Sequence, residues 1–421
     1  MPDFLPFPGL RYVTPATRGG GGGGGGNDGE PGGDISAVCA PPYDVIDPDD
    51  RAALQARDPH NSIRLILPDS YEGAAATLAQ WQADGVLAID DTASFSVYRM
   101  HFTGDDGEPR NTTGVLGALV LDNAAGGIMP HERTLPKAKS DRLELLRATR
   151  ANLDPIWGIT LSPGFTDLLV AEGAPLAVAT DAEGNRHEMW RVEDPGQVGA
   201  IREAVATHEL VLADGHHRFE TGGNYRRERA EAGIDDPGAD AIMCLVVELA
   251  PEELCVRAIH RLLHGVDSLD LRAAAEPMFT VTDLGPNTAD GVTALEAAMA
   301  SEGGLGLVDA HGLALLVPRP ALDDAMGHEP AELRDVDSAR FEAGLRPALE
   351  AAGVTLTYRN DGATCAAHVE KGAADASVLL RAVSVETIRV AAEARIRMPE
   401  KTTFFAPKPR TGMVFRDLDR P

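Results

Sequence analysis

The sequence predicts a mixed α/β (α+β) protein, and three observations lead to that class. Short apolar runs alternate with amphipathic segments of helical period along most of the chain. One apolar run passes through a glycine turn directly into a helical segment, within residues 208–232. The chain has 421 residues, 43% of them hydrophobic, which is enough for a core and more than one ordinary domain needs.

The chain is expected to fall into two regions. Residues 1–265 hold most of the conspicuous motifs and are predicted to form the catalytic region, while residues 266–421 add a C-terminal α/β region. Residues 18–34 contain an unbroken glycine run and are expected to be a flexible insertion, because polyglycine loses too much backbone entropy on ordering. The tail at 395–412 carries aromatic residues and prolines, so we expect it to dock back on the site.

Apolar periodicity and turn residues predict the elements in order. In the first region we expect strands at 62–67, 95–102, 110–121, 177–179, 187–192, 208–213 and 241–248, and helices at 72–85, 143–151, 195–206 and 219–232. In the second region we expect helices at 338–351, 363–371 and 385–396, and strands at 354–358 and 377–383. The two strands at 95–121 should form a hairpin around a Gly-Asp-Asp-Gly turn.

Charge and composition exclude several classes of protein. The chain has 38 Lys and Arg against 65 Asp and Glu, a net charge of −27, which argues against a nucleic-acid or anionic-membrane partner. The four cysteines show no CxxC spacing and indicate a reduced protein rather than a disulfide or zinc framework. No apolar run approaches the ~18 residues of a membrane span, and no signal peptide is evident, so a cytoplasmic location is predicted.

The strongest chemical signal is Asp214-Gly215-His216-His217-Arg218, between a predicted strand and helix. Gly215 permits a tight turn, after which the amides and the dipole at a helix N-terminus favour an anion. Arg218, His216 and His217 add side-chain donors, and Asp214 adds a carboxylate for Mg²⁺ or for a proton. This combination is typical of a phosphate site. The alternative is that Asp214 caps the helix and that the histidines are solvated.

Two segments are cationic within an otherwise acidic protein. Residues 131–150 carry six cations and three acids, and residues 389–416 carry seven cations and two acids. Only five lysines occur in the whole chain, and four of them lie in these segments: Lys137, Lys139, Lys401 and Lys408. Such islands are candidate anion sites, although a solvated helix face explains residues 142–150 equally well. Weaker candidates are the pairs Tyr43-Asp44 and His260-Arg261, and the second pair fits structural packing better than catalysis.

Several common motifs are missing from the sequence. It has no GxxxxGK[ST] loop, no GxGxxG that opens a helix, no G-x-S-x-G elbow, and neither HExxH nor clustered Cys and His. Common nucleotide folds, serine hydrolases and zinc enzymes are therefore disfavoured.

The ordered motifs PPYDVI, HERT, ADGHHRFET, RAIHR and KTTFFAPKPRTG resemble the bacterial and archaeal family catalogued as domain of unknown function 1015, over nearly the whole chain. The sequence departs from that family at the glycine insertion and at residues 402–405. The DGHHR turn is also similar to the signature of the ParB/sulfiredoxin superfamily, where a turn at a helix start holds nucleotide phosphates. That superfamily includes free-serine kinases, so the resemblance implies a ParB/sulfiredoxin-like core and a nucleotide-using phosphotransferase.

The function predicted from sequence is an ATP- or ADP-dependent kinase of a small hydroxylated metabolite, most plausibly L-serine. Gly215, His217 and Arg218 would hold phosphates, with Arg133, Lys137, Lys139, Lys401 and Lys408 as further cations. Asp214 or Glu132 would bind Mg²⁺ or orient the hydroxyl, and His216 is the alternative base. Tyr43, Asp44, His260 and Arg261 would contact the substrate. The oligomeric state stays open.

Two other functions stay open at the level of sequence. One is a nucleoside-triphosphate-binding switch that hydrolyses its ligand slowly. The other is a DNA-associated ParB-like regulator, which the net charge of −27 disfavours.

Overall fold

The computed structural model describes residues 1–14, 33–104, 107–121, 127–132, 139–266 and 269–421. The chain divides into two compact units. The first unit comprises Met1–Pro130, Thr134–Cys255 and Pro407–Pro421, and the second comprises His131–Arg133 and Val256–Ala406. Both combine sheets with helices, so the predicted mixed α/β class is confirmed.

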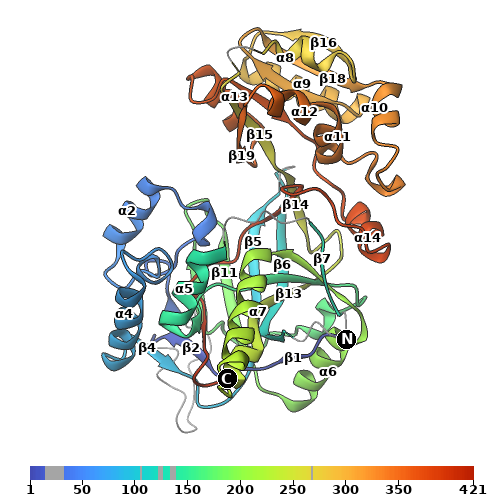
Figure 1. Ribbon diagram of the computed structural model, residues 1–421. Coiled ribbons are helices and arrows are strands. Elements are labelled where there is room, and N and C mark those ends of the chain that lie inside the picture. The colour runs from blue at the N-terminus through green and yellow to red at the C-terminus, as the bar shows by residue number, and fades with distance from the viewer. Residues whose placement is uncertain (15–32, 105–106, 122–126, 133–138, 267–268) are drawn as a thin grey trace. The chain divides into compact units, whose positions relative to one another are not determined.

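A long mixed sheet organises the first unit (Figure 1). Its strands follow the order β3-β10-β11-β5-β6-β13-β9-β12-β7, and β1 pairs with β6. Neighbouring strands are mostly antiparallel, whereas the pairs β13–β9, β12–β7 and β10–β3 are parallel. The strands are β1 (Phe4–Leu5), β3 (Gly33–Asp34), β5 (Phe95–Thr103), β6 (Pro109–Val120), β7 (Ile128–Pro130), β9 (Ile156–Thr160), β10 (Ala177–Thr180), β11 (Arg186–Val192), β12 (Leu210–Asp214) and β13 (Ala241–Glu248).

The middle of this sheet is buried on both faces. β13 lies between β6 and β9, and its apolar residues are all buried, which explains why it is a continuous apolar run in the sequence. Ile201 and Val205 of α6 pack into the core of this sheet. Helix α5 packs against both α4 and α7 (Figure 1). The helices are α2 (Pro48–Arg57), α3 (Ile63–Ile66), α4 (Tyr71–Ala83), α5 (Lys139–Thr149), α6 (Pro195–Thr207) and α7 (His216–Glu231).

A smaller antiparallel sheet ties the last residues of the chain into the first unit. Its order is β4-β2-β22-β8, so β22 lies between two strands from earlier in the chain. Short 3-10 turns complete the unit. The strands of this sheet are β2 (Gly9–Tyr12), β4 (Leu87–Ile89), β8 (Ala151–Asn152) and β22 (Phe415–Asp417), and the 3-10 turns are η1 (Tyr43–Val45), η4 (Thr166–Leu168) and η5 (Pro237–Asp240).

The second unit has its own sheet and core. The sheet order is β16-β18-β17-β20-β15-β19, and β14 pairs with β21 in a separate two-stranded sheet. Leu262, Leu295, Met299 and Leu379 meet in the core. The strands are β14 (Cys255–Ala258), β15 (His260–His264), β16 (Phe279–Gly285), β17 (Leu305–Asp309), β18 (Gly312–Pro318), β19 (Thr355–Arg359), β20 (Ala376–Leu379) and β21 (Thr403–Ala406). The helices are α8 (Leu271–Ala275), α9 (Ala289–Glu302), α10 (Pro320–Ala325), η6 (Ala331–Leu333), α11 (Asp337–Gly344), α12 (Arg346–Ala351), α13 (Gly362–Glu370) and α14 (Val385–Glu393).

Two element predictions were wrong. Residues 62–67 were expected to be a strand but form α3, where the Asn61 side chain accepts a hydrogen bond from Ile63 N and stabilises the helical turn. Residues 338–351 were expected to be one helix, yet α11 ends at Gly344 and α12 begins at Arg346. A proline in the first turn of α12 favours this fresh start.

Other predictions were confirmed or fall outside the described residues. The hairpin of β5 and β6 and the helices α4, α6 and α7 lie where expected. Residues 15–32 of the predicted glycine insertion lie outside the description, and Gly33–Asp34 form β3. The four cysteines are free, as expected. None of the helices among the described residues combines the length and apolar character needed to cross a lipid bilayer.

Candidate functional site

The turn at residues 214–218 joins β12 to α7. The pairing of β12 with β9 shifts register between Leu212 and Asp214, and such irregularities re-aim side chains at strand ends. Gly215 has a φ of 83°, and a Cβ there would lie 2.8 Å from Ile156 Cγ2. Both the backbone and the packing therefore require glycine. α7 starts at the next residue, so the predicted strand–turn–helix is confirmed.

Asp214 lies between two cations at this turn. Lys408 Nζ donates a hydrogen bond of 2.8 Å to Asp214 Oδ2, and Arg218 Nη2 lies 3.6 Å from the same oxygen. All three side chains are at most 22% exposed. Burial would raise the pKa of Asp214, but the charges of Lys408 and Arg218 lower it well below its ordinary value. Asp214 is therefore ionised at neutral pH and is a weak base.

Tyr43 of the PPYD motif lies between two guanidinium groups. The Arg142 guanidinium carbon is 4.3 Å from the centre of the Tyr43 ring, and that of Arg218 is 6.0 Å from it. Burial alone lowers the pKa of Arg218, but Asp214 and nearby acids raise it above its ordinary value. The structure thus brings Tyr43, a predicted substrate residue, into the same group as the DGHHR turn. Its neighbour Asp44 is exposed, and its charge acts on Arg218.

A second carboxyl group, which the sequence analysis missed, belongs to this site. Asp154 is 8% exposed and accepts a hydrogen bond from the Thr411 hydroxyl group. Burial raises the pKa of Asp154, although Arg218 and Arg142 act in the opposite direction. No local motif surrounds Asp154, so the only available signal was the Thr411 side of the contact, in the PKPRTG segment.

A chain of buried hydrogen bonds anchors the segment that carries Lys408. Arg410 N donates to Tyr98 Oη at 3.0 Å, and Tyr98 Oη lies 2.8 Å from His187 Nδ1. His187 Nε2 lies 3.2 Å from Asp181 Oδ2. Since Asp181 can only accept, the consistent tautomer places the proton on Nε2, so that Tyr98 donates to Nδ1. Burial lowers the pKa of His187, which favours this neutral form.

The two histidines of the turn are half-buried. The charge of His216 acts on Asp214, which places the ring within electrostatic range of the carboxylate. His216 and His217 both make interactions with the rest of the protein. They occupy the first turn of α7, beside Arg218.

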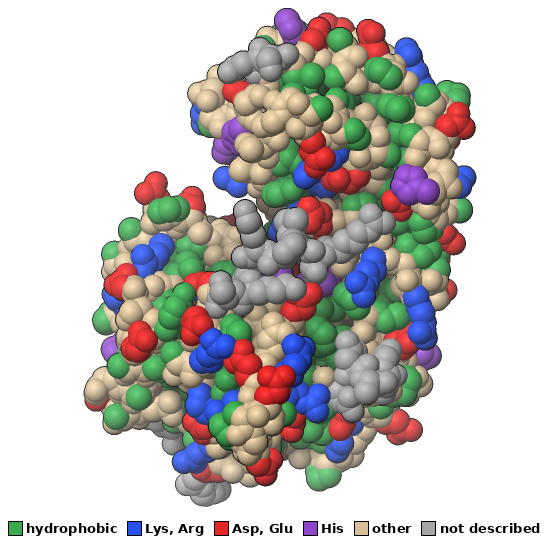
Figure 2. All heavy atoms as spheres, viewed as in Figure 1, with side chains coloured by type: hydrophobic (Ala, Val, Ile, Leu, Met, Phe, Trp, Pro, Cys, Tyr) green, Lys and Arg blue, Asp and Glu red, His purple; other side chains and the backbone are tan. Residues whose placement is uncertain are grey.

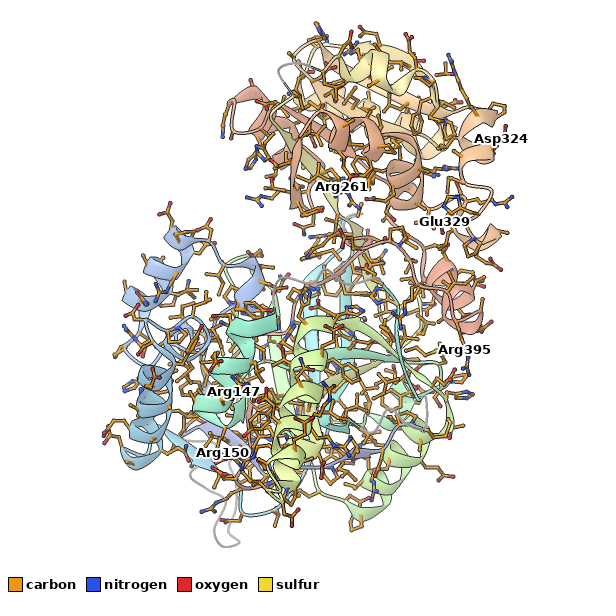
Figure 3. All side chains as sticks on the ribbon, viewed as in Figure 1. Arg147, Arg150, Arg261, Asp324, Glu329 and Arg395 are labelled. Atoms are coloured by element: carbon orange, nitrogen blue, oxygen red, sulfur yellow. The ribbon has the colours of Figure 1, made fainter. Side chains whose placement is uncertain are left out.

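Much of the cationic segment at 131–150 is neutralised by acids. Arg147 pairs with Glu144 and Glu228, and Arg150 pairs with Asp236. Figure 2 shows blue and red side chains mixed over this face, and Figure 3 shows Arg147 and Arg150 where α5 and α7 run side by side. This agrees with the helix-face interpretation of residues 142–150.

Three predicted phosphate-binding cations cannot be placed. Arg133 and Lys137 lie outside the described residues, and Lys139 is described only as the first backbone position of α5. Their roles stay predictions.

Glu132 meets the C-terminal tail within the second unit. Its carboxylate accepts hydrogen bonds from the backbone N–H groups of Lys401, Thr402 and Thr403, at 2.8–3.1 Å, and from the Thr403 hydroxyl group at 2.8 Å. His131 Nε2 lies 2.8 Å from the same hydroxyl oxygen. These contacts suit a structural role for Glu132, which holds the turn at Lys401, where φ is 56°. Its predicted catalytic role stays a prediction.

His260 and Arg261 are buried in the second unit, where Figure 3 labels Arg261. His260 Nδ1 accepts a hydrogen bond from Leu380 N at 3.1 Å, and burial lowers its pKa to about 4. Arg261 is 1% exposed and donates to the carbonyl oxygen of Lys401 at 2.8 Å. Its guanidinium carbon lies 5.4 Å from the centre of the Tyr358 ring. These contacts favour the structural interpretation of the pair over the predicted substrate contact.

The donors around the DGHHR turn suit an anion. Lys408 and Arg218 supply positive charge, and the first N–H groups of α7 lie at the positive end of the helix dipole. Among the described residues there is no cluster of three or more His, Cys, Asp or Glu that could hold a metal ion. A cavity of about 60 Å³ lies next to Arg218, lined by residues of α5, β8, α7 and β13.

Comparison with known proteins identifies the family. The chain belongs to the family described as Protein of unknown function (DUF1015), whose family model matches residues 27–338. No curated protein matches the chain.

Several solved structures are similar at low sequence identity. A conserved hypothetical protein from Pyrococcus furiosus is 15% identical, with a TM-score of 0.39, and the match covers 73% of this chain and 96% of that one. A free serine kinase in complex with AMP is 14% identical, with a TM-score of 0.37 and coverage of 70% and 87%. SbnI with C-terminal truncation from Staphylococcus aureus is 11% identical, with a TM-score of 0.35 and coverage of 71% and 86%. Likeness of this degree carries no argument about function.

Proposed function

Starting from membership of the DUF1015 family, we propose that this protein is a nucleotide-dependent phosphotransferase acting on a small hydroxylated metabolite. Free L-serine is the acceptor to test first. ATP or ADP would be the phosphate donor. The similarity of the DGHHR turn to the ParB/sulfiredoxin signature supports a phosphate-binding role for that turn.

One observation carries the proposal: Asp214 is held between Lys408 and Arg218 at the start of α7. The two cations are side chains, so an anion of higher charge can replace Asp214 as their partner without unfolding the backbone. Phosphoryl transfer depends mainly on positioning and on neutralising phosphate charge. Lys408, Arg218 and the amides of Gly215–His217 would supply both.

The surroundings of the three candidate groups assign their acid–base roles. Asp214 is a poor base because its pKa lies well below neutrality. Glu132 accepts four hydrogen bonds from the tail, so its carboxylate oxygens are already engaged by the protein. His216 is therefore the base that we propose, with Asp214 orienting it by charge.

Mg²⁺ would enter with the nucleotide. Protein sites commonly hold this ion through one or two carboxylates plus substrate phosphates, and Asp214 is the carboxylate proposed here. Its present partners are cations, so metal binding would require Lys408 to move to a phosphate.

The remaining regions, site residues and location predicted from the sequence are part of this proposal. Residues 1–265 would form the catalytic region, and the tail at 395–412 would close on the site, where Lys401, Arg133, Lys137 and Lys139 would add positive charge. Tyr43 and Asp44 would contact substrate, with His260 and Arg261 as weaker candidates. A cytoplasmic location is proposed because nucleotides are available there.

The test is a direct assay of phosphoserine formation. Purified protein is incubated with ATP or ADP, Mg²⁺ and L-serine, and O-phosphoserine is followed by ³¹P NMR and mass spectrometry. Asp214→Ala and Arg218→Met should reduce turnover, whereas Lys371→Met should not, since Lys371 is exposed on the second unit. No phosphoserine, or full turnover in Asp214→Ala, would overturn the serine kinase assignment.

A nucleoside-triphosphate-binding switch that hydrolyses slowly is the second candidate. It requires only the phosphate-binding groups at the turn, Lys408 and Arg218, and no base for an acceptor hydroxyl. Stoichiometric nucleotide binding, with turnover that no amino acid changes, would select it. Binding of duplex DNA in a filter assay at low salt would instead support the DNA-associated regulator, against the net charge of −27.

A further inference from the structure

A small cavity lies beside Arg218 of the DGHHR turn (residues 214–218, proposed above to bind phosphate), within the first unit. It has a volume of about 60 Å³ and is lined by residues of α5, β8, α7 and β13. One buried water needs about 10–15 Å³ on this measure. The cavity therefore has room for several waters or for a small ligand.

The wall of the cavity contains a buried hydroxyl group that has no hydrogen-bond partner in the part of the chain that the structure describes. Thr221 of α7 is 3% exposed, and its Oγ1 makes no hydrogen bond to any of the described residues. Leaving a buried polar group without a hydrogen bond is unfavourable, so such groups in native proteins usually have a water or ligand as partner. Thr221 is one turn of α7 from Arg218, so this hydroxyl group and the phosphate-binding turn share one helix face.

The other polar groups of the cavity wall suit a carboxylate. Arg142 and Arg218 both line it. A guanidinium group has five N–H donors, and within the described residues Arg218 donates a hydrogen bond to the Pro155 carbonyl oxygen and pairs with Asp214 at 3.6 Å. Asp154 also lines the cavity and gives it one acceptor, with one carboxyl oxygen bound to Thr411.

The remaining wall is mostly aliphatic, from Leu145, Leu146, Ala151, Leu153 and Ile242. Asn152 also lines it, but its side-chain oxygen already accepts hydrogen bonds from Met243 N and Arg416 Nη1. This surface suits a short carbon skeleton.

We propose that this cavity is the acceptor subsite, and that it binds a small carboxylic acid with an adjacent hydroxyl or amino group. Its carboxylate faces Arg142 and Arg218, and its second polar group meets Thr221 and Asp154. The inference rests on the proposed function for its role in transfer, because it places the acceptor next to Arg218, which also holds phosphate. The binding itself can be measured without nucleotide or turnover.

The test is calorimetric titration of the full-length protein, without nucleotide, with L-serine, D-glycerate and L-lactate. We expect at least one of the three to bind. Thr221→Val removes the hydroxyl group at nearly constant volume and should weaken that binding about tenfold, the size of one lost hydrogen bond. Thr221→Ser keeps the hydroxyl group and should restore the affinity to within about threefold of the parent.

Thr166→Val is the matched control. Thr166 Oγ1 is also buried without a partner among the described residues, but it does not line the cavity. This variant should leave affinity for the acid unchanged. Neither Val variant should lower the melting temperature, since each replaces an unsatisfied hydroxyl group with a methyl group.

The outcomes separate this inference from the proposed function. If none of the three acids binds, or if Thr221→Val binds like the parent, the cavity holds water only and the inference is wrong. If an acid binds with the expected variant effects but no phosphate is transferred, the subsite stands and the phosphotransferase proposal falls. If transfer occurs and Thr221→Val leaves the KM for the acceptor unchanged, the phosphotransferase stands and the subsite falls.

Discussion

Two motif carboxylates, Asp214 and Glu132, meet the C-terminal tail in different ways. Asp214 of the first unit contacts the tail through the side chain of Lys408. Glu132 of the second unit contacts it mainly through backbone N–H groups of residues 401–403. Both acids were equal candidates for catalysis in the sequence, since each lies beside cations in a recognisable motif.

The difference separates a side-chain contact that a ligand can replace from backbone contacts that a ligand cannot replace. A side-chain cation can rotate toward an incoming phosphate, whereas a backbone N–H group can leave its acceptor only if the chain refolds locally. Asp214 thus suits a site that binds ligand, and Glu132 suits an anchor. The following predictions test this contrast, in order of decreasing effect.

The largest effect is expected for Lys408→Met, which keeps the length of the side chain and removes its charge. We expect kcat/KM for phosphoryl transfer to fall by about 10²–10³-fold, the usual cost of one preorganised electrostatic group. Circular dichroism and melting temperature should change little. Lys371→Met is the control in steady-state kinetics, because Lys371 is exposed in the second unit. If Lys408→Met lowered the stability of the protein while the folded protein kept full activity, Lys408 would be an anchor and the contrast between Asp214 and Glu132 would be wrong.

Glu132→Ala should act on stability instead. It leaves three backbone donors and the Thr403 hydroxyl group without their acceptor, so we expect the free energy of unfolding to drop by about 2–3 kcal/mol. Urea denaturation measures this drop. Glu370→Ala, an exposed acid in the same unit, should cost less than about 0.5 kcal/mol. A stable Glu132→Ala protein that has lost turnover would show that Glu132 is catalytic.

His260 extends the comparison to a neutral anchor. Burial lowers the pKa of His260 to about 4. Below pH 6.5 the unfolded chain therefore protonates this ring, whereas the folded chain protonates it only near pH 4. This contribution to stability is present above pH 6.5 and is lost as the pH falls toward 4, by about 2 kcal/mol at pH 4.5. His260→Gln, which keeps an acceptor for Leu380 N, should flatten the profile of urea midpoints between pH 4.5 and 7. An unchanged slope in this variant would exclude His260 as its source.

The smallest effect is expected for Tyr98→Phe, which removes a backbone anchor from the first unit. Arg410 N and His187 Nδ1 lose their partner, so we expect about 1 kcal/mol lower stability. Because Lys408 lies two residues from Arg410, nucleotide affinity should also weaken, by about threefold. Tyr12→Phe removes a comparable hydrogen bond to His60 O and should lower stability without changing affinity. Equal effects of the two variants on nucleotide affinity would reject this positioning role.

The parts of the fold that were predictable have a clear local period. The hairpin of β5 and β6 and the turn from β12 into α7 follow from alternation and from glycine. α3 was missed because Ile63, Leu65 and Ile66 are all buried, so the segment shows no helical period. The small sheet of β4, β2, β22 and β8 was missed because β22 pairs with β2 and with β8, which lie hundreds of positions earlier in the chain.

The site was predictable where one motif supplies the contact. Asp214, Gly215 and Arg218 share the turn, and rare lysines drew attention to Lys408. Asp154 and Thr221 were not predictable, since their importance comes from burial beside α5 and α7. Polar groups of this kind become visible only when tertiary packing shows what surrounds them.

The position of β22 between β2 and β8 has a consequence for biosynthesis. Residues 407–421 belong to the first unit, yet a ribosome makes them only after residues 256–406. During translation the first unit therefore lacks β22, a middle strand of its small sheet, until the second unit has been made and is free to fold. A chain cut short before residue 408 lacks the lysine partner of Asp214 as well as the middle strand of this sheet.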